Sequence, residues 1–333
     1  MFNIIKFKTK LKKLTYSILN PKRTDNLRNI FSQLNRIFYD YKKAKEINDI
    51  VETRKIHIKT SEDVGLLLEL HKYFKTIDLK YNYEIDSLSN AGRLNCDNLI
   101  SKGIKLEGKD IVDLGAGHGQ NLMMIKEFKF KSATGLDYSD TNFLSHKDEL
   151  DPEIFNAIDF MTTDLIEDEI GSDFCDIIFS FSAFEHFQHP DVVLDKCYRA
   201  LRKGGILYAE FSAFHSAYAS HRKIFTGIPY VQNIFNEETA FDFYYNKLKI
   251  NEGINRYTKE QITDGNPFPE INRWTIKDFN KIFLDKSKWR IIDFTKVYNY
   301  KFSWLVNIFK EQMKELSQDD IYVNALKYII QKK

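Results

Sequence analysis

The sequence predicts an α/β fold in which helices flank a doubly wound parallel sheet. Apolar runs of strand length alternate with helical stretches between about residues 88 and 211, several runs end in an acidic residue, and one leads into three alternating glycines. Parallel strands need crossover connections, and the alternation of strands with helices supplies them.

The first strand is expected at Ile111–Leu114, directly before a loop with glycine at 115, 117 and 119. Glycines let the backbone turn sharply and approach a ligand, and a helix that begins near Gly119 would offer unpaired N–H groups. A dinucleotide fingerprint needs Gly or Ala where this chain has Gln120, so nicotinamide binding is disfavoured.

The second and third strands are expected at 133–137 and 158–161. Asp137 ends the second strand 22 positions after Gly115, a spacing that suits an acid on a ribose. Asp164 follows the third strand, where its carboxylate could accept a hydrogen bond from an adenine amino group. Three neighbouring strand ends would therefore carry acids.

A buried fourth strand is expected from Asp176, followed by a loop and a helix over 191–201. Gly204-Gly205 is expected to break that helix before a fifth strand at 206–211. The pattern of strand and helix thereby repeats as a doubly wound sheet requires.

Residues 88–211 resemble the class I S-adenosylmethionine-dependent methyltransferases, in particular the ubiquinone-biosynthesis-type group. The motifs that carry this resemblance are Asp113 to Gly119, Gly135-Leu136-Asp137, Asp164-Leu165, Phe184-Glu185-His186 and Leu201-Arg202-Lys203-Gly204-Gly205. In the last motif, Arg202-Lys203 replaces the family's usual lysine and proline. The resemblance implies a Rossmann-like seven-stranded sheet with a reversed last hairpin, and S-adenosyl-L-methionine as the cofactor.

The cofactor contacts predicted on this basis come from the strand ends and the glycine loop. They are Asp113, Gly115, Ala116, Gly117, His118, Asp137, Tyr138, Asp164, Leu165 and Ser180. His118 has a second interpretation, in which its side chain simply points to solvent.

The candidate catalytic residues are Glu185 and His186, with His215 and His221 from a later segment. His186 could take a proton near neutral pH, and Glu185 could orient it or contact the ligand. A supporting or helix-capping role for Glu185 and His186 is an equally open alternative. Some relatives hold a divalent ion with two glutamates and histidines in these regions. Because Ser182 stands three positions before Glu185, no metal is expected here.

Residues 212–270 form an insertion that is too long for a plain connection, and we expect it to cap the substrate site. It is rich in aromatic residues, and Phe225 to Tyr230 look like the substrate-side insert of some uncharacterised members of the family. We expect most of these aromatics to form a small core of the insert, while a few of them and the histidines face the acceptor. A helix is expected from Asn272 through Phe283 and a sixth strand over 289–294, whereas 321–330 could be helix or strand.

The expected domains are a basic helical region over 1–80 and a methyltransferase domain over 81–333. The first sixty residues carry fifteen Lys and Arg against five Asp and Glu, so their net charge is +10 and that of the remainder −8. Helices are expected over 4–18, from Thr24, and from Thr60-Ser61, the last burying Leu66, Leu67, Leu70 and Phe74. The region is interpreted as an appendage with solvated lysines, and contact of residues 1–20 with an anionic membrane is the alternative.

The three cysteines are scattered without C-x-x-C spacing and are expected to be buried thiols. No run of 18 apolar residues and no signal-peptide core is present, so a cytoplasmic location is expected, with membrane contact at most peripheral. The basic stretch has no recognisable nucleic-acid-binding motif.

The sequence therefore favours a methyltransferase that acts on oxygen of a small molecule or glycan. The alternatives are a nicotinamide-dependent oxidoreductase and a non-catalytic protein that binds partners.

Overall fold

The computed structural model describes residues 40–54, 60–74, 84–222, 226–247 and 271–333. The helix expected over 4–18 lies outside these residues. Of the stretch expected to be helical from Thr24, the structure describes only the helical segment 40–54. Within the described residues, no helix is both long enough and apolar enough to cross a membrane.

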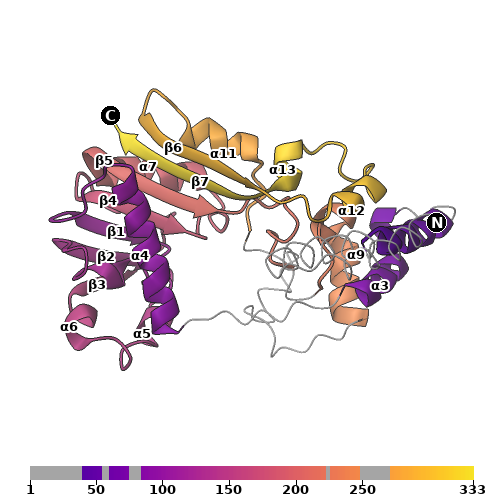
Figure 1. The fold of residues 1–333 in the computed structure, drawn as a ribbon, viewed down its shortest axis with the longest axis horizontal. Coiled ribbons are helices and arrows are strands. Elements are labelled where there is room, and N and C mark those ends of the chain that lie inside the picture. Colours follow the sequence, from indigo (N-terminus) through magenta and orange to yellow (C-terminus); the bar gives the residue numbers. More distant parts are fainter. Residues whose placement is uncertain (1–39, 55–59, 75–83, 223–225, 248–270) are drawn as a thin grey trace, which may run out of the picture.

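A seven-stranded sheet forms the centre of the fold, with the strand order β3-β2-β1-β4-β5-β7-β6 (Figure 1). The strands are β1 (Asp110–Leu114), β2 (Ser132–Asp137), β3 (Ile158–Thr162), β4 (Cys175–Phe181), β5 (Leu201–Phe211), β6 (Trp289–Tyr298) and β7 (Val323–Lys332). Strands β1 to β5 are parallel, whereas β7 runs antiparallel to both β5 and β6. The doubly wound sheet with a reversed last hairpin is thus confirmed.

Longer helices cover the sheet, and shorter ones lie in its connections. They are α4 (Ile85–Ser101), η2 (Leu122–Met124), α5 (Thr141–Leu144), α6 (Pro152–Phe155), α7 (Pro190–Ala200) and α11 (Ile276–Phe283). Helix α11 begins four residues later than expected, because Thr275 caps it in a capping box with Asp278. The helix expected near Gly119 is only the three-residue 3-10 turn η2. Of the region 321–330, residues 321 and 322 end the short helix α13 (Gln318–Tyr322), and the rest belongs to the strand β7.

Residues Gly204 and Gly205 lie within β5 rather than between a helix and a strand. Helix α7 ends at Ala200, and β5 already pairs with β4 at Leu201 before a register shift between Cys175 and Ile177. Gly204 has a φ of +79°, which glycine tolerates best, so the pair forms an irregularity of the strand.

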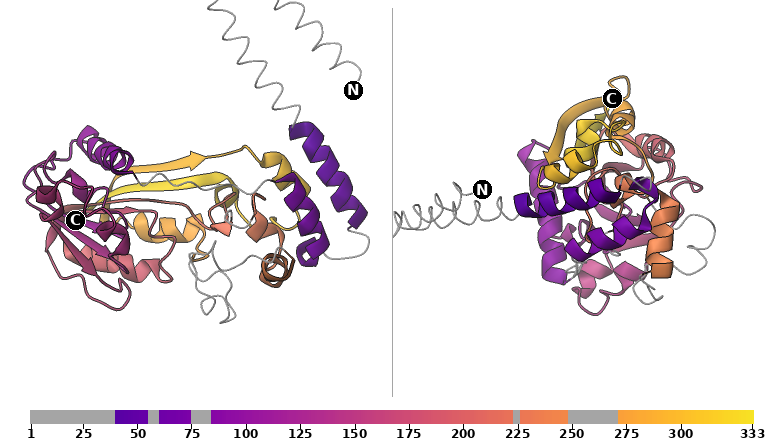
Figure 2. Two further views of the ribbon diagram at one scale, coloured as in Figure 1. Left: turned by 90° about the horizontal axis from the view of Figure 1, so that it is seen from below. Right: turned by 90° about the vertical axis from the view of Figure 1, so that its right-hand side faces the viewer.

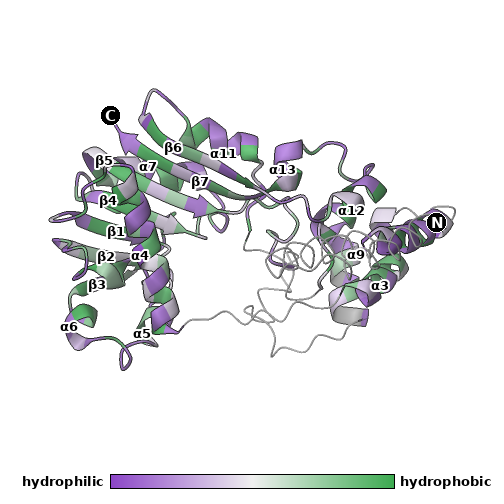
Figure 3. Ribbon diagram, viewed as in Figure 1, coloured by the Kyte–Doolittle hydropathy of each residue, from purple (hydrophilic) through white to green (hydrophobic). Residues whose placement is uncertain are grey.

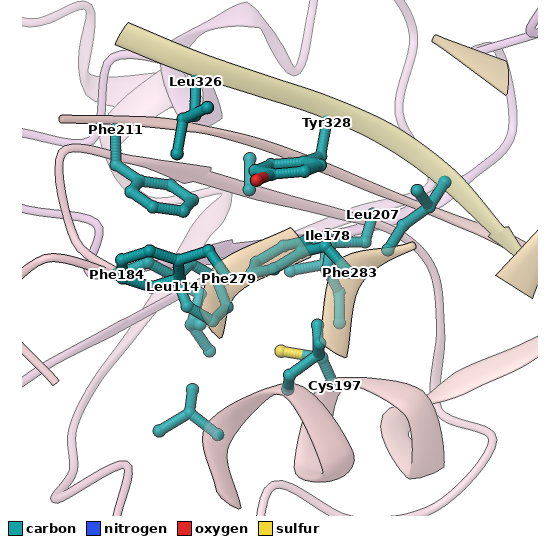
Figure 4. Close-up of a cluster of buried hydrophobic side chains, with 14 of the residues drawn as sticks. Leu114, Ile178, Phe184, Cys197, Leu207, Phe211, Phe279, Phe283, Leu326 and Tyr328 are labelled. Atoms are coloured by element: carbon teal, nitrogen blue, oxygen red, sulfur yellow. The ribbon is translucent and has the colours of Figure 1, made fainter. Parts of the chain in front are cut away.

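Alternate residues of the central strands pack on opposite faces of the sheet. On one face Ile178 and Leu207 pack with α7 and α11, in the cluster drawn in Figure 4. On the other face Ile177 and Phe179 pack with α4 and η2. Successive side chains of a strand point to opposite faces of the sheet, and both faces are buried here. This is typical of a parallel sheet covered by helices on both sides.

A third hydrophobic cluster lies at the other end of the elongated molecule, beyond β6 and β7 (Figures 1 and 2). Its elements are the helix over 40–54, α3 (Val64–Tyr73), α8 (Val231–Ile234), α9 (Glu237–Phe241), the π-helix η4 (Asp242–Lys247) and α12 (Ser303–Ile308). Figure 3 shows apolar and polar residues mixed along these elements. Helix α3 buries Leu66, Leu67 and Leu70 as expected, although it follows a 3-10 turn and is capped by Asp63.

The insert does not form a core of its own in the described residues. Tyr230, Phe235, Phe243 and Tyr244 pack in the third cluster, together with α3 and residues from 302–322. Phe225 lies outside the described residues. The aromatic residues therefore join the insert to segments that are distant in sequence.

Candidate active site

A cavity of about 530 Å³ lies at the carboxyl ends of the parallel strands. These ends face the part of the molecule that contains the third cluster (Figure 1). The residues that line the cavity are Asp113, Gly115, Ala116, Gly117, His118, Gln120, Asp137, Tyr138, Asn142, Thr163, Asp164, Leu165, Ile166, Phe181, Ser182, Ala183, His186, Phe187 and Gln188. A crevice at this edge of an open sheet is the usual ligand site of α/β folds.

The glycine loop is shaped by glycines with positive φ. Gly115 has a φ of +70°, and a Cβ there would lie 2.5 Å from the Cβ of Ala183. Gly117 has a φ of +49°, and a Cβ there would meet no atom within 4 Å. The first glycine thus permits close packing of loop against loop, whereas the second faces open space.

Asp137 supports the glycine loop as well as the cavity wall. Its Oδ2 accepts a hydrogen bond from the Gly117 N–H at 2.8 Å, and its Oδ1 accepts one from the Ser139 N–H at 3.2 Å. A carboxylate can accept about four hydrogen bonds, so acceptor sites remain for a ligand. Asp164 lies further along the same wall, where its Oδ1 accepts from the Ile166 N–H at 2.9 Å.

Asp113 is a buried residue of the cavity wall and ends a chain of two side-chain amides. Its Oδ2 accepts a hydrogen bond from Asn121 at 2.8 Å, and the Asn121 Oδ1 accepts one from Asn95 at 2.9 Å. Burial raises the pKa of the Asp113 carboxyl well above its ordinary value, because the charged form loses its hydration. A cationic group of a ligand at this place would favour the charged form.

Of two further expected cofactor residues, one lines the cavity and the other does not. Ser180 is fully buried beside the cavity and is not among its lining residues; its hydroxyl donates to the Leu114 carbonyl at 3.1 Å. His118 lines the cavity, where the expected contact requires it, and its Nδ1 lies 2.8 Å from the Nε2 of His146.

Beyond the glycine loop, Glu185, His186 and His221 meet. One potential ligand atom of each side chain lies within 4.8 Å of those of the other two. His186 lines the cavity, and its ring centroid is 5.1 Å from that of His221. Glu185 is only 3% exposed, and burial raises its pKa to about 8.

His215 belongs to a different environment, although it too was expected among the catalytic residues. Its Nδ1 lies 3.0 Å from the Asn233 Oδ1, and the Asn233 side chain donates in turn to the His215 carbonyl at 2.7 Å. It is neither a lining residue of the cavity nor a member of the group formed by Glu185, His186 and His221.

Asn272 fixes the loop that carries Glu185 and His186. Its side-chain amide donates to the carbonyls of Phe184 at 2.7 Å and Phe187 at 2.8 Å, and its backbone N–H donates to the Glu185 carbonyl at 2.8 Å. Asn272 is 6% exposed and 85 to 88 positions away in sequence. No spacing rule could have indicated this role.

Sequence reasoning assigned no ligand contact to several lining residues. Thr163, Ile166, Phe181, Ser182, Ala183, Phe187 and Gln188 all follow or end a strand, so the strand pattern could have indicated them. Asn142 lies in α5 and Gln120 after the glycine loop, and neither carried a signal for contact with the cavity.

Comparison with known proteins gives a family match over the strands that build the cavity. Residues 112–209 match the family model described as a methyltransferase domain. A comparison with curated proteins gives no match.

Among solved structures, this chain is similar to an S-adenosylmethionine-dependent methyltransferase from Mesorhizobium loti, with 15% identity and a TM-score of 0.45. That match covers 74% of this chain and 100% of the other. It is also similar to phosphoethanolamine N-methyltransferase 2 from Haemonchus contortus, solved in complex with S-adenosyl-L-methionine, with 15% identity and a TM-score of 0.44. That match covers 72% of this chain and 52% of the other.

The matched segment contains the glycine loop and the strand ends with Asp113, Asp137 and Asp164. The seven strands have the order and the reversed hairpin that the sequence resemblance implied. This chain therefore carries a methyltransferase domain and is an enzyme of this kind, built on a seven-stranded sheet with a reversed last hairpin.

Proposed function

We propose that this methyltransferase transfers the methyl group of S-adenosyl-L-methionine to an oxygen atom of a small molecule or glycan. The observation that carries this proposal is the group of Glu185, His186 and His221, because it places proton-accepting side chains beside the cofactor cavity. An oxygen acceptor must lose its proton, whereas a neutral amine can attack without a base.

The cofactor would lie along the carboxyl ends of β1 to β4. Asp137 would accept hydrogen bonds from the ribose hydroxyls and Asp164 one from the adenine amino group, with Tyr138 and Leu165 beside the base. Asp113 and the loop from Gly115 to His118 would contact the methionine part.

The transfer would be an in-line displacement. The acceptor oxygen forms a bond to the methyl carbon while the carbon–sulfur bond breaks. The electron pair of the broken bond stays on sulfur, which leaves S-adenosylhomocysteine. The enzyme mainly has to align the two reactants and exclude water, since the sulfonium methyl is already activated. The hydroxyl proton would pass to His186, with Glu185 and His221 beside it.

Isothermal titration with S-adenosylhomocysteine and, separately, with NAD tests the first half of this proposal. We expect binding of S-adenosylhomocysteine alone. Binding of NAD alone would indicate an oxidoreductase, and binding of neither would indicate a protein that acts only through partners.

The acceptor is accessible to mass spectrometry of metabolites and surface glycans from cells with and without the gene. We expect a species that is 14 daltons lighter when the gene is absent. A mass difference confined to methylated nitrogen would contradict oxygen as the acceptor atom.

Residues 1–20 lie outside the described residues, so the hypothesis of membrane contact rests on their composition. We propose a cytoplasmic protein whose basic N-terminal region is an appendage with solvated lysines, and peripheral contact of residues 1–20 with the inner face of an anionic membrane is the alternative. If the alternative holds, flotation with anionic liposomes should show salt-sensitive binding of the full chain, which a variant without residues 1–20 lacks. Absence of flotation at low salt would leave the appendage interpretation.

A further inference from the structure

A second cavity, of about 400 Å³, lies at the opposite edge of the sheet from the cofactor cavity. Strand β4 shows the separation, because Asp176 near its start lines the second cavity and Phe181 at its end lines the cofactor cavity. Five residues of a strand span about 17 Å. A ligand in the second cavity would therefore not reach the methyl group that the enzyme transfers.

Basic side chains dominate the wall of the second cavity, and these are Lys102, Lys105, Lys109, Lys203 and Arg290. Among the described residues, Asp176 is the one acidic side chain in the wall. Residues 61–333 carry a net charge of −8, so this concentration of positive charge is opposite in sign to the chain around it. A cleft lined by charge of one sign focuses the electric field and attracts ligands of the opposite sign.

Two of the five cations already have a carboxylate partner. The Lys102 Nζ lies 3.2 Å from the Asp293 Oδ2, and the Lys109 Nζ lies 3.4 Å from the Asp176 Oδ1. The Asp176 Oδ2 also lies 3.0 Å from Nη1 of Arg202, a residue outside the wall. The charge of Asp176 is thus already offset by two cations.

The other three cations are Lys105, Lys203 and Arg290, all of them exposed. They form no ion pair within the part of the chain that the structure describes. Arg290 donates from Nη1 to the neutral side chain of Gln331 at 3.4 Å. Three like charges that share one cavity repel one another, and a bound anion would offset this repulsion.

The rest of the wall is largely apolar or lacks a side chain. Ile177 and Ile206 are buried, whereas Ile104 and Ile292 are half-buried. Gly103 has a φ of +79°, and a Cβ there would meet no atom within 4 Å. A cavity of this volume is in the range of small-molecule sites and is larger than a phosphate ion needs.

We propose that the second cavity binds a small organic molecule that carries a phosphate or diphosphate group. Lys105, Lys203 and Arg290 would contact the phosphate oxygens, since lysine acts as a compact positive charge and arginine can bind two oxygens at once. The half-buried isoleucines would contact the organic part. Because the cavity lies at the other edge of the sheet, this molecule is a second ligand of the enzyme and not the methyl acceptor.

Inorganic pyrophosphate is the probe, because it carries the charge of a diphosphate without an organic part. Isothermal titration of the full chain at constant ionic strength should show saturable binding to a single site. Saturating S-adenosylhomocysteine should leave the affinity for pyrophosphate within about twofold, since the two cavities are separate. Competition between the two would place pyrophosphate in the cofactor cavity and would overturn the proposal.

The variants Lys105→Glu and Lys203→Glu should each weaken pyrophosphate binding about tenfold or more, because an attractive charge becomes a repulsive one. Lys277→Glu is the matched control, since Lys277 is an exposed lysine of α11 outside the cavity wall and the net charge changes equally. It should bind pyrophosphate as the wild type does. Lys203→Arg keeps the charge and should retain binding. Circular dichroism shows whether each variant is folded.

The first sixty residues carry fifteen Lys and Arg, which could also attract pyrophosphate. Equal affinities of the wild type, Lys105→Glu and Lys203→Glu would place the binding there and would overturn the proposal. Absence of saturable binding to the wild type up to about 1 mM pyrophosphate would overturn it as well. Saturating pyrophosphate should raise the Tm of the wild type and of Lys277→Glu, but not that of Lys105→Glu.

Discussion

Replacement of Asp137 tests the assignment of the cofactor cavity most directly. The Asp137 carboxylate accepts two backbone N–H bonds, from Gly117 and Ser139, and lines the cavity where a ribose would lie. Asp137→Ala removes these bonds together with any bonds to the ribose hydroxyls. Hydrogen bonds to a charged group contribute about 1.5–3 kcal/mol each, and part of that loss is shared with the free protein.

We therefore expect S-adenosylhomocysteine to bind Asp137→Ala about 1–3 kcal/mol more weakly, a loss of about 5- to 150-fold in affinity. Asp137→Asn keeps an oxygen that can accept a hydrogen bond from the Gly117 N–H but loses the charge. Its affinity for S-adenosylhomocysteine should therefore lie between that of the wild type and that of Asp137→Ala. Asp164→Ala should lose less than Asp137→Ala, because Asp164 is exposed and does not contact the glycine loop.

Isothermal titration with S-adenosylhomocysteine measures these affinities, and circular dichroism shows whether each variant is folded. Asp159→Ala is the matched control, because Asp159 is an exposed aspartate on β3 that does not line the cavity. Unchanged affinity in folded Asp137→Ala would remove Asp137 from the ribose role and would refute the reasoning.

Four further predictions concern single contacts. Gly115→Ala should lower the Tm and the cofactor affinity more than Gly108→Ala does. Both glycines have positive φ, but only at position 115 would a Cβ lie 2.5 Å from the Cβ of Ala183. Equal effects of the two substitutions would contradict this reason. Asn272→Ala should lower the free energy of unfolding by about 1–3 kcal/mol in urea titrations, since the buried Phe184 carbonyl and the partly buried Phe187 carbonyl lose their donor, whereas exposed Asn156→Ala should change it little. The pKa of Asp113 is raised in the folded protein, so the unfolded chain releases this proton at a lower pH than the folded protein does. As the pH rises above about 4, the Tm of the cofactor-free wild type should therefore fall relative to that of Asp113→Asn. A Tm difference that does not grow between about pH 4.5 and 7.5 would exclude this cause. The thiols of Cys96, Cys175 and Cys197 are buried, and burial raises the pKa of Cys96 and of Cys175 to about 12, so none should react with a thiol reagent at pH 8 before the protein is unfolded.

The sequence alone was enough to predict the five parallel strands and the acids at their ends. Asp113, Asp137 and Asp164 each stand at the end of an apolar run, and parallel strands present these ends at one edge of the sheet. The positions depend on local patterns of two to six residues, which is why they were predicted correctly. The resemblance to class I methyltransferases then led to the order of the last hairpin.

Several features of the site depended on the tertiary structure. The convergence of His221 with Glu185 and His186, the separate environment of His215 and the hydrogen bonds from Asn272 join segments tens of residues apart. The aromatic residues of the insert likewise pack with α3 and residues from 302–322 rather than among themselves. Spacing in sequence determines which residues share a strand end or a helix face. Which distant side chains meet is decided by how the elements pack, and that depends on the fit of the whole core.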